Sequence, residues 1–123
     1  IESRLIELLT RRNRMTHAVV TSFDYKSLCI LKRQAPDIKI GLTYSNDFVH
    51  HYQVTQLVDV PVYSIQPSHL RINRQDVQDA LSRGLQVFAY TVNDESDMRR
   101  VIDYGVSGIL TDCPRKLFAL LNR

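Results

Sequence analysis

A short β-rich run followed by a helical run recurs along this chain at intervals of about 20 to 25 residues. The five expected strands span residues 18–23, 38–44, 60–65, 85–90 and 108–111. Strands that alternate with helices form parallel sheets, because a parallel pair needs a crossover connection. Two α/β architectures fit: the C-terminal half of a TIM-type (β/α)₈ barrel, with about five parallel strands, or a self-contained flavodoxin-like sheet. The order of the strands would distinguish them.

Local signals mark the ends of the expected helices. Asp24, Asn73 and Asp112 stand where a side-chain oxygen caps the first turn of a helix. Gly84 and Gly105 stand where a left-handed residue closes one. Residues 1–9 have the pattern of a helix already under way, so we expect sequence upstream of residue 1.

Composition excludes several classes of function. Of the 123 residues, 44% are hydrophobic and 24% charged, as in an ordinary soluble domain. The net charge of +3 is dispersed except for Arg11, Arg12 and Arg14, which complement the negative end of a helix dipole. We therefore predict no nucleic-acid partner. Cys29 and Cys113 are too few for a disulfide framework, so we expect reduced thiols and a cytoplasmic setting.

Chemistry in either architecture gathers where the strands end. Asp24 and Asp112 are the carboxylates expected there, and helix capping explains both. The adjacent His50 and His51 cannot share one ion on a helix, so both are expected at the surface. His69 follows the third strand, where a site role and an ordinary loop position are both open. The residues alone predict neither a catalytic constellation nor a metal site.

Four short segments follow one another in a definite order. Residues 21–24 (T-S-F-D) and 35–41 (A-P-D-I-K-I-G) lie in a strand-to-helix segment and the next strand, and residues 90–93 (Y-T-V-N) and 105–114 (G-V-S-G-I-L-T-D-C-P) follow in the last third. In this order they resemble the glycerophosphodiester phosphodiesterases, in which the last two segments read W-T-V-N and G-V-D-G-I-I-T-D-x-P. Two residues depart from the pattern: Tyr90 stands for tryptophan and Ser107 for aspartate.

The resemblance implies that residues 1–123 are the C-terminal portion of a (β/α)₈ barrel whose N-terminal half is absent. The whole protein would hydrolyse glycerophosphodiesters to an alcohol and glycerol 3-phosphate with the help of Mg²⁺ or Ca²⁺. The histidine, glutamate and aspartate segments that do this in the family precede residue 21 and have no match here. This chain alone is therefore expected to be inactive, with no catalytic residue and no metal ligand. Only substrate-binding roles carry over, to Tyr90 first and to Gln66 and Asn93 less strongly.

The resemblance also implies partners and a location. Unpaired edges are expected at residues 18–23 and at the last strand, where the missing half or a second copy would pair. Some family members carry a membrane region before the barrel, so attachment through a region outside this chain is the alternative to a purely cytoplasmic protein. A noncatalytic interaction domain that keeps the barrel half as a scaffold is a further alternative.

Overall fold

The five strands form one parallel sheet in which each strand pairs with the next along the chain. The computed structural model describes residues 1–122, and the sheet order is β1-β2-β3-β4-β5. The strands are β1 (Val19–Ser22), β2 (Lys39–Tyr44), β3 (Ser64–Pro67), β4 (Gln86–Ala89) and β5 (Gly108–Ile109). A doubly wound sheet reverses its order partway, whereas a barrel does not. The sequential order therefore confirms the barrel half and excludes the flavodoxin-like sheet.

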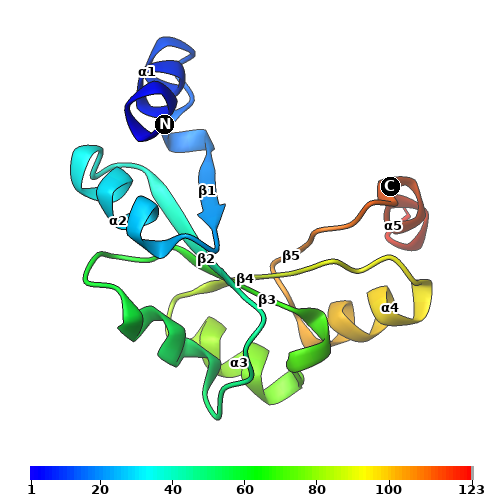
Figure 1. The fold of residues 1–123 in the computed structure, drawn as a ribbon. Helices are drawn as coiled ribbons and strands as arrows, with labels where there is room; N and C mark the ends of the chain where they lie inside the picture. Colours follow the sequence, from blue (N-terminus) through cyan, green and yellow to red (C-terminus); the bar gives the residue numbers. More distant parts are fainter. Residues whose placement is uncertain (123) are drawn as a thin grey trace.

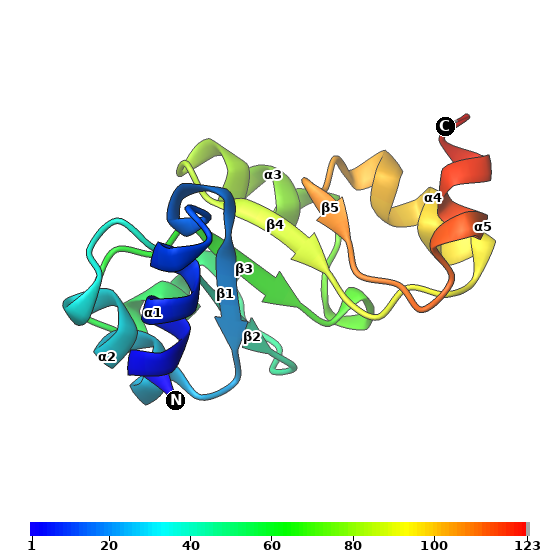
Figure 2. The ribbon, with the colours of Figure 1, turned by 90° about the horizontal axis from the view of Figure 1, so that it is seen from above.

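The helices lie along one side of this curved row of strands (Figure 1). They are α1 (Glu2–Arg11), η1 (Met15–His17), α2 (Tyr25–Gln34), η2 (His51–Leu57), η3 (His69–Arg71), α3 (Arg74–Ser82), α4 (Glu95–Tyr104) and α5 (Pro114–Leu120). Figure 2 shows α1 beside α2 at one end of the row, and α4 beside α5 at the other. The complementary half of a barrel would continue from these two ends.

The core fills the layer between the strands and their helices. Ile40 and Leu42 of β2 are fully buried, as are Val77 of α3 and Met98 of α4 within 1%. Burying an aliphatic side chain of this size stabilises a fold by roughly 1.5 to 3 kcal/mol. The alternation along β2 also sets its other residues, including Gly41, on the opposite face of the sheet.

That opposite face carries no helix in Figure 1, and its central part, on β2 and β3, is polar. Gly41 is in register with Ser64, and Thr43 with Gln66, so these side chains share it. On β2 and β3, the face that a complete barrel would enclose is therefore lined by hydroxyl and amide groups, and Phe88 of β4 adds an aromatic ring to it.

Most of the predicted helix ends are confirmed. The Asp24 carboxylate accepts from the Ser27 amide at 3.2 Å, and Asn73 forms a reciprocal capping box with Asp76. Gly84 and Gly105 are left-handed, with φ of 83° and 92°. The predicted cap at Asp112 is wrong, because the chain turns one residue later and Cys113 is the N-cap of α5.

Two strands differ from the expected ranges by more than one residue at an end. We expected the third at residues 60–65, but β3 is Ser64–Pro67, because pairing with β2 begins only at Ser64 opposite Gly41. Gln66, one residue beyond the end of the expected strand, thus lies within β3. The last strand is two residues long instead of four, because β5 has a neighbour on one side only and pairs with Phe88 and Ala89.

Candidate functional site

Tyr90 lies just beyond β4, at the end of the sheet where all five parallel strands finish. Its backbone forms an isolated parallel bridge with Ser68, and its hydroxyl donates to the Tyr44 carbonyl at 2.8 Å. The Tyr90 ring also meets Phe23 edge to face, with 6.1 Å between centroids. One residue therefore links the ends of β1, β2, β3 and β4, through its backbone and its side chain.

The hydroxyl of Tyr90 acts as a donor. Burial raises the pKa of Tyr90 above its usual 10, so the phenol keeps its proton at neutral pH. That proton is directed at the Tyr44 carbonyl. The hydroxyl that Tyr90 has and tryptophan lacks therefore makes a hydrogen bond within the fold. The ring remains available as an aromatic wall.

Gln66 lies deeper on the helix-free face, and only 4% of it is exposed. Its Oε1 lies 3.3 Å from the Ser64 hydroxyl, which donates to it. Both side chains occupy the space above Gly41, where a Cβ would clash with Ser64 Oγ and Gln66 Oε1. Glycine at position 41 therefore lets the amide lie flat against the sheet.

Asn93 holds two loops together. Its Oδ1 accepts from Thr111 Oγ1 at 3.0 Å and from the Asp112 amide at 2.9 Å. Its Nδ2 donates to the Asp112 carboxylate at 3.1 Å, and Lys116 Nζ donates to its carbonyl at 2.9 Å. The Y-T-V-N and T-D-x-P segments, distant in sequence, are thus fastened to each other through one amide.

His69 is nearly buried. Its backbone amide donates to the Tyr90 carbonyl at 2.9 Å, so the two residues lie side by side. Arg100 of α4 donates to His69 Nδ1 at 2.8 Å and to its carbonyl at 3.2 Å. Burial lowers the pKa of His69, and the Arg100 guanidinium lowers it further, against an opposing effect of Asp97. A neutral imidazole that presents Nε2–H is the result.

The described residues do not fit the Mg²⁺ or Ca²⁺ that the resemblance implies. Both ions need several converging oxygen ligands. The Asp24 carboxylate is used by Ser27 and the Asp112 carboxylate by Asn93. In the described part of the chain, no three His, Cys, Asp or Glu side chains are assembled as a metal centre.

The predicted surface position of His51 is wrong. His51 is 1% exposed, and its Nδ1 lies 2.7 Å from Tyr44 Oη. The signal was the spacing of His51 and Val54, three residues apart, which places both on one side of the 3₁₀ helix η2. His50 faces outward and stacks on Tyr52.

Ser107, the other departure from the family pattern, lies at the opposite end of the sheet. It precedes β5, and its hydroxyl accepts from the Val87 amide at 2.9 Å. The residue therefore has a local role in starting β5, distant from Tyr90.

The model of the glycerophosphoryl diester phosphodiesterase family matches residues 2–116. The chain belongs to this family. A glycerophosphodiester phosphodiesterase of Caldanaerobacter subterraneus subsp. tengcongensis is 32% identical over 123 residues, which cover all of this chain and 50% of that protein. One of Bacillus subtilis is 26% identical over 110 residues, or 38% of its length. The chain thus spans about half the length of the curated relatives it matches.

Solved structures share the fold. A putative glycerophosphoryl diester phosphodiesterase from Silicibacter pomeroyi superposes with a TM-score of 0.86 at 24% identity, over 98% of this chain and 43% of that one. A phosphodiesterase from Oleispira antarctica, solved with its product sn-glycerol-3-phosphate, superposes with a TM-score of 0.75 over 85% of this chain and 42% of that one. The family barrel is therefore the fold to which these five strands correspond.

Among the described residues, none of the helices has both the length and the apolar character needed to cross a bilayer.

Proposed function

We propose that residues 1–123 form the C-terminal part of a barrel that hydrolyses glycerophosphodiesters to an alcohol and glycerol 3-phosphate. The observation that carries this proposal is the sequential parallel order of five strands in a chain matched by the family model from residue 2 to residue 116. The catalytic groups and the ligands for Mg²⁺ or Ca²⁺ belong to the complementary half, since the described strand-end carboxylates serve other partners.

The substrate-binding roles follow from the positions of three side chains. Tyr90 offers an aromatic wall where the strands end, and Gln66 offers an amide on the face that a barrel encloses. Asn93 is the weaker assignment, because both atoms of its amide are already bonded to the loop before α5. We assign to Tyr90 contact with the glycerol part of the substrate.

The complementary half is the proposed partner. β1 and β5 each pair on one side only within residues 1–122, so each presents unused backbone donors and acceptors. A barrel has no edges, so closure would satisfy both strands at once. A second copy of this chain is the competing partner and would give a dimer.

The location is proposed on separate grounds. Cys29 and Cys113 are both free and half-buried. Reduced thiols are typical of the cytoplasm, which is the compartment we propose for this part of the protein.

The test is release of glycerol 3-phosphate from glycerophosphocholine, with Mg²⁺ or Ca²⁺. We expect no turnover from the folded chain alone, and turnover once the N-terminal half of the Caldanaerobacter relative is added. Turnover without that half would place catalytic groups within these residues. A folded chain that forms a complex with the added half but gives no turnover would refute the enzyme assignment.

Two variants at position 90 test the wall in the reconstituted enzyme. Tyr90→Ala removes the ring, so we expect KM to rise about tenfold, equivalent to about 1.4 kcal/mol of binding. Tyr90→Phe keeps the ring and loses only the bond to Tyr44, so its KM should stay near that of the wild type. Equal KM values for all three proteins would remove Tyr90 from the substrate site.

A further inference from the structure

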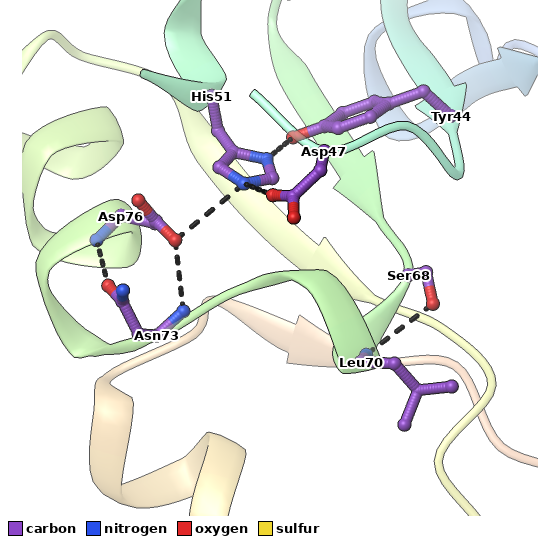
Figure 3. A network of polar contacts seen from close by, with 7 residues as sticks. All are labelled: Tyr44, Asp47, His51, Ser68, Leu70, Asn73 and Asp76. Atoms are coloured by element: carbon purple, nitrogen blue, oxygen red, sulfur yellow. Dashed lines mark hydrogen bonds and ion pairs between the residues drawn. The ribbon is translucent and has the colours of Figure 1, made fainter. Parts of the chain in front are cut away.

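One buried polar atom is left without a hydrogen bond: Nε2 of His51, among the described residues that are not exposed. It faces two carboxylates, with Asp76 Oδ2 at 3.6 Å and Asp47 Oδ1 at 3.8 Å (Figure 3). A buried polar group without a partner is costly, so its persistence calls for an explanation. Both distances are too long for a hydrogen bond, so neither carboxylate satisfies Nε2 as the side chains stand.

Each carboxylate oxygen lies about as far from His51 Nε2 as two ligands of one metal ion lie from each other. Zinc binds imidazole nitrogen and carboxylate oxygen at about 2.0 to 2.2 Å, so two such ligands at tetrahedral or slightly wider angles lie roughly 3.3 to 3.7 Å apart. The separations from His51 to Asp76 and to Asp47 are within about 0.1 Å of this range. A cation between them would bond to His51 Nε2 and neutralise both carboxylates.

The far side of the imidazole is prepared for this role. A histidine that binds metal through Nε2 carries its proton on Nδ1 and donates it to a second group, which fixes the ring. Tyr44 Oη lies 2.7 Å from His51 Nδ1 and is itself buried. The ring is also held by Phe48 and Tyr44, with centroids 5.9 and 5.6 Å away.

Asp47 is the exposed carboxylate of the pair, and Asp76 is the more buried one. Its side chain is 72% exposed, whereas that of Asp76 is 16% exposed and is held by the Asn73 amide at 3.0 Å. As it stands the cluster is two separate ion pairs, in keeping with the lack of an assembled centre among the described residues. Rotation of the exposed Asp47 side chain would have to bring in the third ligand.

We propose that His51, Asp47 and Asp76 form a binding site for a divalent transition metal of the zinc class, on the helix-covered side of the sheet. One nitrogen and two carboxylates suit zinc, whereas Mg²⁺ and Ca²⁺ prefer oxygen alone. The ion would tie the end of β2 to η2 and to the first turn of α3. This proposal does not depend on the proposed hydrolysis, and its ligands are separate from Tyr90, Gln66 and Asn93.

The experiment is calorimetric titration of the chelator-treated protein with Zn²⁺ near pH 7, repeated with Co²⁺ to record its visible absorption. We expect one ion per chain, a band typical of four-coordinate Co²⁺, and no competition from excess Mg²⁺. Asp47→Asn should weaken binding at least tenfold. Tyr44→Phe, which removes the outer partner of the ring, should weaken it by about 10- to 100-fold.

His50→Gln is the matched control, because the neighbouring exposed imidazole should contribute nothing. His51→Gln should abolish binding, and Asp47→Asn keeps the test valid if that variant does not fold, since Asp47 is at the surface. Absence of binding in the wild-type protein, equal binding by Asp47→Asn, or loss of binding in His50→Gln would each overturn the proposal.

Discussion

His69 is a residue whose charge is controlled by several surrounding groups. Burial is the main cause of its lowered pKa, with the Arg100 guanidinium acting in the same direction and the Asp97 and Asp94 carboxylates opposing it. The folded protein therefore binds a proton at His69 less readily than the unfolded chain does. Linkage then requires that this contribution to stability be present above the ordinary pKa of about 6.5 and be lost as pH falls through the lower folded value.

We accordingly predict that His69→Gln flattens the fall in stability below about pH 6.5. The melting temperature of both proteins, measured at steps from pH 7.5 to pH 5, tests this. His50→Gln, which changes an exposed imidazole, serves as the control and should follow the wild type. Parallel curves for the wild type and His69→Gln would contradict the prediction.

Single residues also mark the limit of what the sequence could predict. Asp24, Asn73, Gly84 and Gly105 act through backbone groups within a few residues, so their roles could be predicted from local pattern. The burial of His51 depends on Tyr44 and on Asp76, which is distant in sequence, and a local pattern does not contain those contacts.

At the scale of elements, α3 and α4 begin in different ways. The Asn73 side chain accepts from the Asp76 amide at 2.9 Å, and Asp76 returns the bond to the Asn73 amide. Asp94 occupies the same position before α4 and makes no side-chain cap bond within residues 1–122. The two helices therefore allow a comparison of an N-cap residue that makes a side-chain bond with one that does not.

We predict that Asn73→Ala lowers the free energy of unfolding by about 0.5 to 2 kcal/mol, the usual worth of an N-cap. Asp94→Ala should cost less, about 0.3 to 1 kcal/mol, since only its interaction with the helix dipole is lost. Urea denaturation of the two variants measures both values. A larger loss of unfolding free energy for Asp94→Ala than for Asn73→Ala would show that the side-chain cap bond does not decide how much each N-cap residue stabilises its helix.

Strand ends were harder to predict than helix caps. The start of β3 at Ser64 is set by its register with Gly41, and the short β5 by its single neighbour. The candidate site shares this difficulty: Tyr90 and Asn93 could be chosen from their motifs, but the use of the Tyr90 hydroxyl by Tyr44 is a contact between strands. Sequence patterns predicted the elements, and tertiary pairing fixed their limits.

At the scale of the whole molecule, protection should decrease from the middle of the sheet to its edges. β3 has neighbours on both sides and its four residues are buried, whereas β1 has one neighbour and alternates between exposed and half-buried residues. Amides in β1 and β5 should therefore open more readily than those in β2 and β3.

We predict that hydrogen exchange followed by mass spectrometry shows the slowest exchange in peptides from β2 and β3, and at least tenfold faster exchange in β1, equivalent to about 1.4 kcal/mol. Addition of the complementary half should slow amide exchange in β1 and β5 more than in β2 and β3. Protection of β1 equal to that of β3 in the chain alone would indicate that its edge is already covered, for instance by a second copy.

The sequential order of the strands has a consequence for how the chain reaches this structure. Val19 pairs with Lys39, Gly41 with Ser64, Ser64 with Gln86, and Phe88 with Gly108. Each pairing closes a loop of roughly 20 residues, so every step carries a similar entropic cost, and none has to wait for a distant segment. Folding can therefore start at any neighbouring pair and spread in both directions, as it does in repeat proteins.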